Sequence, residues 1–265
     1  MEKDILQEII AQKRIEMARQ KEAVPESRLE EMLEADGKAG KAGRSMKASL
    51  AASAGIIAEF KRRSPSKGWI HRDADPAKTA ASYSRAGASA LSVLTDEPFF
   101  GGTLADLKRV REATNLPILR KDFVISRYQL LQAKLTGADA VLLIAAALAP
   151  DECRTLARNA HELHLEVLLE LHKEDELECY CEFVDMVGVN NRNLGTFRTD
   201  VESSFRMAEK LPADALRVSE SGLSSPETVN CLREAGYRGF LMGETFMKAP
   251  DPGKALSDFL NRLDA

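Results

Sequence analysis

Cysteine is scarce in this 265-residue chain, and the four cysteines follow no pattern that binds a metal or builds a disulfide framework. They stand at Cys153, Cys179, Cys181 and Cys231, without a CxxC pair. These spacings argue against an extracellular domain held by disulfides and against a structural zinc site. We therefore expect reduced, buried thiols and no metal.

Long apolar runs and an excess of positive charge are also missing. The longest apolar run, residues 138–149, is interrupted by Asp139 and is far shorter than the ~18 residues of a membrane span. Residues 1–20 carry charges throughout, so they do not resemble a signal peptide. The net charge of −4 and the pI near 5.7 disfavour a nucleic-acid binder held by phosphate contacts. We expect a cytoplasmic protein with a small-molecule partner, and neither nucleic acid nor membrane as partner.

Short apolar runs alternate with amphipathic segments from residue 56 onward, which is typical of parallel strands covered on both faces. The predicted strands are Ile56–Phe60, Ala88–Leu94, Pro117–Asp122, Ala138–Ala145, Leu165–Leu171, Val184–Asn190, Ala215–Glu220 and Gly239–Gly243. Eight such units in one chain of this length predict a single α/β domain, the (β/α)8 TIM barrel. A doubly wound open sheet is the alternative, but neither GxGxxG nor GxxxxGK[ST] occurs.

The first 50 residues have a different pattern. Apolar residues recur at helical spacing from Ile5 to Met17, and a second helical pattern follows Pro25. Neither segment has enough apolar residues for a core of its own. We expect residues 1–50 to be a helical extension that packs on a catalytic barrel of residues 51–265.

Polar residues stand at the ends of six predicted strands. In a TIM barrel the carboxyl ends of all strands open at one mouth, so these side chains converge there. One charged residue at a strand end is usually a solvated tip, but six such ends together favour a catalytic site. The residues concerned are Glu59 and Lys61, Lys121 and Asp122, Glu170, Asn190 and Arg192, Glu220, and Glu244.

Lys121 is the most informative of these residues. It follows Leu119 by two positions and so points into the barrel if Leu119 does. Carboxylates such as Glu59 and Glu170 would keep a buried Lys121 protonated, as a general acid requires, whereas an unpaired lysine suits Schiff-base chemistry. Glu59 and Lys61 share one strand face, either as an acid–base pair or as a salt bridge at the rim.

Glycines follow the last two predicted strands, in Ser221-Gly222 and in Gly243-Glu244. Loops at these strands are the usual phosphate site of the fold, because glycine lets backbone N–H groups approach an anion. Ordinary turn glycines are the alternative. Ser64, in RRSPSKG, lies in a loop that either closes over the same substrate or is an exposed basic loop.

Seven segments together resemble the indole-3-glycerol phosphate synthase family of tryptophan biosynthesis. They are IIAEFKRRSPSKG, SVLTDEPFFGGTLADL, PILRKDFVISRYQL, GADAVLLIAAAL, VGVNNRNL, SESGL and FLMGETFM. The resemblance implies conversion of 1-(2-carboxyphenylamino)-1-deoxyribulose 5-phosphate to indole-3-glycerol phosphate, with release of carbon dioxide and water and without a cofactor.

The resemblance also implies roles for individual residues. Lys121 matches the family's general acid, and Glu170, Glu59 and Lys61 match groups that position it and move protons during dehydration. The implied substrate-binding residues are Asn190, Arg192 and Glu220, and the implied phosphate-binding residues are Ser221, Gly222 and Gly243. Ser64, in the loop after the first strand, and Phe123, in an apolar patch that favours release of carbon dioxide, are further candidates for substrate binding, and Glu244 is a candidate for phosphate binding through its backbone N–H.

Two residues depart from the family's pattern. Arg120 replaces a smaller residue before the catalytic lysine, and as an outward-facing residue it must find cover between helices. Glu244 stands where serine is common, and an inward carboxylate there would disfavour phosphate. A class I aldolase, a sugar-phosphate isomerase and a noncatalytic binding protein remain alternative functions. We expect a monomer or a weak homo-oligomer.

Overall fold

The computed structural model describes residues 5–37, 40–193, 195–196 and 198–263. Within these ranges the strands form a closed parallel barrel in the order β1-β10-β9-β8-β7-β6-β5-β4, with β4 returning to β1. The barrel strands are β1 Ile56–Phe60, β4 Ala90–Leu94, β5 Ile118–Lys121, β6 Ala140–Ile144, β7 Glu166–Leu171, β8 Met186–Asn190, β9 Leu216–Glu220 and β10 Gly239–Met242. The predicted TIM barrel is confirmed, and the predicted strand bounds differ from the observed ones by no more than two residues.

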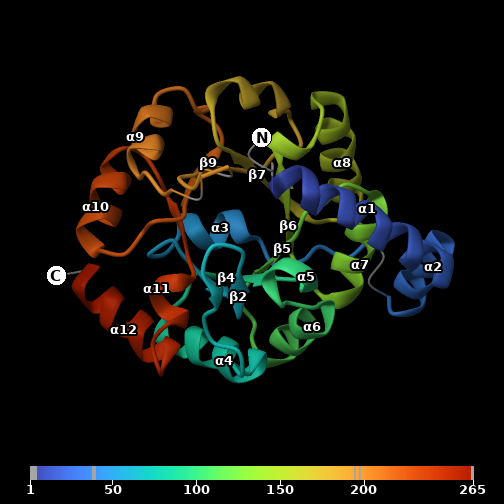
Figure 1. Cartoon of the computed structure of the whole chain (residues 1–265), viewed down its shortest axis with the longest axis horizontal. Coiled ribbons are helices and arrows are strands. Elements are labelled where there is room, and N and C mark those ends of the chain that lie inside the picture. The colour runs from blue at the N-terminus through green and yellow to red at the C-terminus, as the bar shows by residue number, and fades with distance from the viewer. Residues whose placement is uncertain (1–4, 38–39, 194, 197, 264–265) are drawn as a thin grey trace.

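Helices surround this barrel as a ring (Figure 1). The helices are α1 Ile5–Ala23, α2 Glu26–Ala35, α3 Met46–Ala51, α4 Pro76–Ala86, α5 Glu97–Phe100, α6 Leu104–Ala113, α7 Arg127–Thr136, α8 Pro150–Glu162, α9 Glu202–Ala208, α10 Pro226–Glu234, α11 Glu244–Met247 and α12 Pro252–Leu263, with 3-10 turns η1 Ala145–Ala147 and η2 Glu174–Cys179. Capping residues in the sequence determine where several of these helices begin. The side chains of Asp75, Thr103 and Ser225 accept backbone N–H groups at the first turns of α4, α6 and α10.

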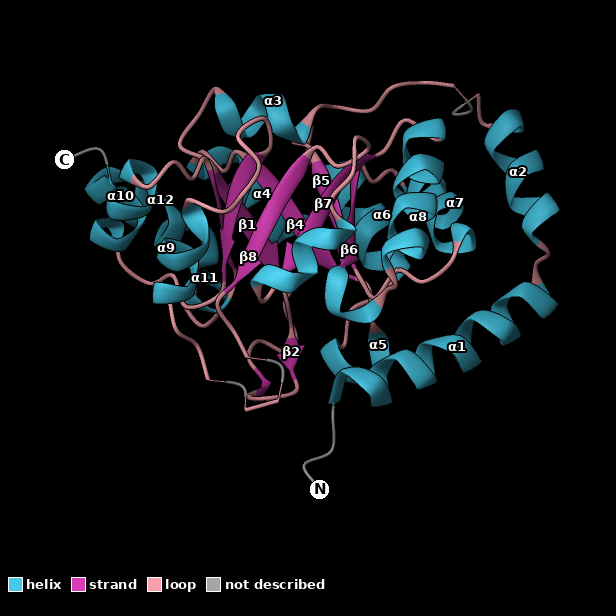
Figure 2. Cartoon of the chain, turned by 90° about the horizontal axis from the view of Figure 1, so that it is seen from above, coloured by secondary structure: helices cyan, strands magenta, loops and turns pink. Residues whose placement is uncertain are grey.

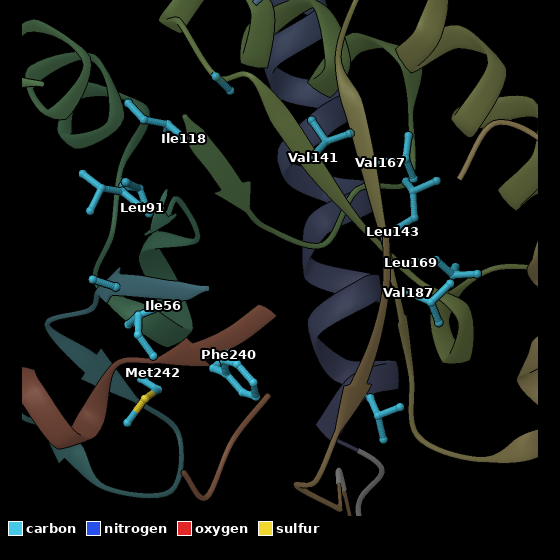
Figure 3. Close-up of a cluster of buried hydrophobic side chains, with 14 of the residues drawn as sticks. Ile56, Leu91, Ile118, Val141, Leu143, Val167, Leu169, Val187, Phe240 and Met242 are labelled. Carbon is cyan, nitrogen blue, oxygen red and sulfur yellow. The ribbon is translucent and has the colours of Figure 1, made fainter. Parts of the chain in front are cut away.

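Alternation along each strand separates two hydrophobic layers. Outward side chains such as Ile56, Val141 and Val167 belong to the large core between strands and helices (Figure 3). Inward side chains such as Leu119 and Leu142 belong to a second cluster, which fills the barrel interior. The last inward position of several strands is polar, so the same alternation brings charged groups to the mouth.

The N-terminal helices lie at both ends of the barrel. In Figure 2, α3 covers one end and α1 crosses the opposite end. Met46 and Leu50 of α3 join the interior cluster, and Glu166 accepts the N–H groups of Met46 and Lys47 at 2.7 and 2.9 Å. Helix α3 therefore closes the end opposite the mouth.

Helix α2 holds the extension against the outside of the barrel. Leu29 and Leu33 of α2 pack with Tyr128 and Leu131 of α7. A two-stranded antiparallel sheet, β2 Arg63–Ser64 with β3 Gly68–Trp69, lies in the connection that follows β1. Among the described residues, no helix is long and apolar enough to cross a membrane.

Candidate active site

A cavity of about 460 Å³ opens at the carboxyl ends of the barrel strands. It brings together every residue for which the sequence predicted a role at the site. Those residues are Glu59, Lys61, Ser64, Lys121, Phe123, Glu170, Asn190, Arg192, Glu220, Ser221, Gly222, Gly243 and Glu244. Their sequence separation is large, so their proximity results from the closed barrel.

Lys121 lies at the centre of an ion cluster at the end of β5. Its Nζ is 2.9 Å from Glu170 Oε2 and 3.0 Å from Glu220 Oε2. The expected partner Glu59 does not contact it directly, because Glu59 Oε1 pairs with Lys61 Nζ at 2.7 Å. Lys121 therefore reaches across the barrel to β7 and β9.

The two carboxylates beside Lys121 have opposite pKa shifts. Burial raises the pKa of Glu170, but Lys121 and His172 outweigh this effect and lower it to about 2. Burial raises the pKa of Glu220 to about 7, because Lys121 only partly offsets the burial and the charge of Glu170 adds to it. Near neutral pH the cluster thus offers an ionised carboxylate and a second carboxyl group close to its titration point.

The surrounding carboxylates keep Lys121 itself protonated. Burial lowers its pKa, but Glu170 and Glu220 outweigh the burial, and the pKa is raised above its ordinary value. Lys121 is therefore an ammonium at neutral pH. A raised pKa suits proton donation and opposes the neutral amine that a Schiff base requires.

Asn190 and Arg192 extend the cluster at the end of β8. The Asn190 side chain hydrogen bonds to Glu170 and lowers its pKa, and Asn190 Oδ1 accepts the backbone N–H of Arg192 at 3.0 Å. Arg192 Nη1 donates to Ser66 Oγ at 3.2 Å. This contact links the loop after β1 to the loop after β8 across the cavity.

Gly243 makes room for the Glu59–Lys61 pair. A Cβ atom at Gly243 would lie 2.4 Å from Glu59 Oε1 and 3.0 Å from Glu59 Cβ. Any larger residue would displace the Glu59 side chain, which is 2% exposed. The glycine predicted from phosphate binding is therefore also required by close packing.

The loop after β9 has an unusual backbone. Ser221 has φ 68° and Gly222 has φ 77°, so two consecutive residues adopt left-handed conformations. Such conformations are uncommon outside glycine and concentrate at functional sites. Consecutive N–H groups in turns of this kind can form a concave anion site.

The two departures from the family's pattern have structural explanations. Arg120 is 2% exposed and lies between β5 and α7, where it donates to Asp122 Oδ2 at 2.8 Å and to the carbonyl of Gln129. Arg120 is therefore covered as expected, although by one helix, α7, and by residues that follow the strands rather than by two helices. The Glu244 carboxylate is 37% exposed and lies 3.7 Å from Lys67 Nζ, so a rim cation partly neutralises it.

Sequence reasoning missed His172. It expected the segment before Ser45 to help cover the substrate, but it did not name the residues through which that segment reaches the cavity. His172, which was given no role, places Nε2 3.5 Å from Glu170 Oε1 and Nδ1 3.7 Å from Glu176 Oε2. The apolar side chains Ile5, Leu6 and Ile9 of α1 line the cavity. His172 follows Glu170 by two positions, which was a usable signal for a shared strand face. The role of α1 depends on tertiary packing.

Among the residues that the structure describes, no group of three or more His, Cys, Asp or Glu side chains is arranged to hold a metal ion. The fold and site define a class: a TIM-barrel enzyme that performs acid–base chemistry on a small anionic substrate.

Comparisons with known proteins identify the family within this class. A family model for indole-3-glycerol phosphate synthase matches residues 6–259. An indole-3-glycerol phosphate synthase of Bacteroides thetaiotaomicron is 59% identical over 262 residues, which cover 98% of this chain and 99% of that protein. One from Koribacter versatilis is 46% identical over 210 residues, covering 79% and 81%. The chain belongs to the indole-3-glycerol phosphate synthase family, whose members are carboxy-lyases.

Solved structures of low sequence identity share the fold. A mutant tryptophan synthase α-subunit from Pyrococcus furiosus gives a TM-score of 0.60 at 14% identity and covers 80% of this chain and 98% of its own. A thiamine phosphate pyrophosphorylase from the same organism gives 0.59 at 16% identity, covering 83% and 98%. At these identities the likeness concerns the barrel alone.

Proposed function

We propose that the cluster around Lys121 carries out the family's reaction on 1-(2-carboxyphenylamino)-1-deoxyribulose 5-phosphate. The observation that carries the proposal is a protonated Lys121 held between two buried carboxylates inside a cavity of about 460 Å³. The ring closure is intramolecular, because the attacking carbon and the carbonyl belong to the same substrate molecule. The protein must therefore supply orientation and protons and stabilise the charge that develops.

Lys121 acts in the ring closure. The ring carbon that carries the carboxylate attacks the ribulose carbonyl, a carbon–carbon bond forms, and negative charge develops on the carbonyl oxygen. Lys121 donates a proton to that oxygen, and Glu170, 2.9 Å from its Nζ, orients the ammonium. The carboxylate then leaves as carbon dioxide, and the electron pair of the broken bond returns to the ring. The apolar side chains Phe123 and Leu142 line this part of the cavity and favour the neutral product.

Glu59, Lys61 and Glu170 act in the dehydration. The new hydroxyl group leaves as water after it gains a proton, and a base removes the proton whose loss completes the indole double bond. Lys61 and Glu59 form an acid–base pair at 2.7 Å, and Glu170 remains ionised at neutral pH. Glu220 lines the site and tunes the charge of Lys121.

The phosphate end of the substrate is held on the opposite part of the rim. Ser221, Gly222, Gly243 and the backbone at Glu244 contact the phosphate, since they follow the last two strands and line the cavity. Ser64 closes this end from the loop after β1. Arg192, with Asn190, orients the hydroxyl and anionic groups between the two ends.

The remaining proposals concern the protein as a whole. Residues 1–50 act as an extension that packs on a catalytic barrel of residues 51–265 and covers part of the mouth through α1. We further propose that the protein works in the cytoplasm as a monomer or weak homo-oligomer, without nucleic-acid or membrane partners. All four cysteines have free thiols, which supports this location. The expectation of buried thiols is correct for Cys153, Cys179 and Cys181 and wrong for Cys231, which is exposed.

Turnover of the proposed substrate by the purified protein, followed by the fluorescence of the indole product, tests the function. Lys121→Met deletes the ammonium and keeps most of the side-chain volume. We expect kcat to fall by about 10² to 10⁴, with a smaller change in KM because the phosphate contacts remain. Near-normal turnover by the variant would remove Lys121 from the mechanism.

Borohydride treatment separates this mechanism from that of a class I aldolase. Reduction in the presence of substrate traps a Schiff base as a stable adduct, which mass spectrometry locates. We expect no adduct on Lys121 of the wild type. An adduct there would replace the acid role with a nucleophilic one.

A further inference from the structure

Lys13 connects the N-terminal helix to the barrel through a buried ion network. It lies on α1, and its side chain is 1% exposed. Its Nζ is 2.8 Å from Asp96 Oδ2, 3.1 Å from Asp122 Oδ1 and 3.0 Å from Glu16 Oε2. Asp96 follows β4 and Asp122 follows β5, so a single ammonium joins three segments that are distant in sequence.

The surroundings keep this ammonium charged despite its burial. Burial lowers the pKa of Lys13, but Asp122 and Asp96 outweigh the burial and raise it above the ordinary value. Asp122 is also bound by Arg120 at 2.8 Å and by Thr95 Oγ1 at 2.7 Å. Loss of one partner from a buried ion pair leaves an uncompensated charge, so replacement of Lys13 by an uncharged residue should destabilise this network.

Both aspartates bound by Lys13 also fix an aromatic residue of the cavity. Asp96 Oδ1 accepts the N–H of Phe99 and so caps α5, which carries Phe100. Asp122 Oδ1 accepts the N–H of Phe123 at 2.8 Å. The rings of Phe100 and Phe123 lie 6.1 Å apart between centroids, and both line the cavity.

Lys13 also fixes the roof of this part of the cavity. Ile9 stands one helical turn before Lys13 on the same face of α1 and lines the cavity, as do Ile5 and Leu6. Asp122 directly follows Lys121 in the chain, so the backbone that carries the ammonium of the active site is held from its other side.

We propose that Lys13 is a positioning residue, which fixes α1, Phe100 and Phe123 as the apolar enclosure of the substrate's aromatic ring. It touches neither the substrate nor the reacting atoms, and it acts through Asp96 and Asp122. The phosphate contacts lie on the loops after β9 and β10, outside this network. This inference rests on the proposed function, since it assigns the aromatic end of that substrate to one side of the mouth.

Lys13→Met tests the proposal, with Arg127→Met as the matched control. Arg127 also pairs a cation with the extension, at 2.9 Å from Glu26 and 2.6 Å from Glu30, but these partners lie on α2 and away from the mouth. We expect Lys13→Met to raise KM and lower kcat, so that kcat/KM falls by at least about tenfold, and Arg127→Met to stay within about twofold of the wild type.

Two fragments of the substrate show which end is affected. We expect the inhibition constant of anthranilate to rise by about tenfold in Lys13→Met, while that of inorganic phosphate stays within about twofold of the wild type. Equal weakening of both fragments would indicate a general loss of structure and would overturn the proposal, as would unchanged binding of anthranilate.

A second variant covers the case in which Lys13→Met folds poorly. Adding Asp96→Asn removes one uncompensated carboxylate, and asparagine still caps α5. We expect the double variant to recover thermal stability but to keep the weak binding of anthranilate. Recovery of both stability and wild-type kinetics would reduce Lys13 to a folding role. Failure of the wild type to turn over the substrate would instead contradict the proposed function, so the two failures are distinguishable.

Discussion

Replacement of Glu220 by glutamine isolates the energetic effect of the raised pKa at the centre of the site. The Glu220 side chain is 1% exposed, and its pKa rises from an ordinary value of 4.5 to about 7. Between these two values the folded protein binds more protons at this group than the unfolded chain does. The free energy of unfolding contributed by Glu220 therefore falls as the pH rises from 4.5 to 7.

The size of the effect follows from the shift. One pKa unit corresponds to about 1.4 kcal/mol, so ionisation of Glu220 in the folded state costs about 3 kcal/mol. Glutamine has nearly the same shape and no charge at any pH. The stability of Glu220→Gln relative to the wild type should thus rise by about 3 kcal/mol between pH 4.5 and pH 8.

Urea unfolding followed by circular dichroism, at several pH values across this range, measures the difference. Glu244→Gln is the matched control, because it makes the same substitution at a carboxylate that is 37% exposed at the rim. We expect Glu220→Gln to lose activity while it gains stability above pH 7, since the variant no longer holds Lys121 between two carboxylates. Parallel stability curves for the wild type and Glu220→Gln would refute the reasoning.

Two further predictions concern packing and cofactors. Gly243→Ala should lower kcat/KM by at least about tenfold, because the new Cβ atom would lie 2.4 Å from Glu59 Oε1 and displace this carboxylate. Steady-state kinetics measure this effect, and unchanged kinetics would mean that Glu59 has room to move. Treatment with EDTA followed by desalting should leave turnover intact, because Lys121 supplies the positive charge that the developing oxyanion needs; activity that returns only on addition of a divalent cation would contradict this mechanism.

The barrel was predictable from the count of eight strand–helix units, and strand alternation indicated which polar residues at the strand ends point into its mouth. Leu119 and Lys121 share a face, as do Ile57 and Glu59, and the interior cluster contains Leu119 and Ile57. Once the strands close into a barrel, the polar residue after each inward apolar one must reach the mouth.

The pairing within the site was not predictable from the same pattern. Sequence reasoning offered Glu59 and Glu170 as partners of Lys121, whereas the observed partners are Glu170 and Glu220. Alternation determines which face a residue occupies, but it does not determine which side chains meet across the barrel. Which carboxylates pair with Lys121 depends on side-chain length and on Lys61, which forms an ion pair with Glu59.

The sequence of α1 contains an indication of its role that arguments from strand alternation and strand number do not address. Lys13 stands between Ile9 and Met17 at intervals of one helical turn, so it interrupts an apolar stripe with a charge. A lysine on a buried stripe requires carboxylate partners. Two were available directly after predicted strands, at Asp96 and Asp122, but only the fold shows that α1 passes above both.

The charges on the two sides of Lys121 differ in a way that explains where the site responds to pH. Behind it, Lys13 and Arg120 face Asp96 and Asp122, so buried cations and carboxylates balance. Inside the mouth, two lysines face three carboxylates, and burial, together with the charges of Glu170 and Glu59, raises the pKa of Glu220. Behind Lys121, the pKa of Lys13 is raised and that of Asp122 is lowered, so both groups stay charged near neutral pH, whereas Glu220 in the mouth titrates there. Proton exchange is thus confined to the side of the strand that faces the substrate, while the other side keeps its charges and holds the backbone of β5 in place.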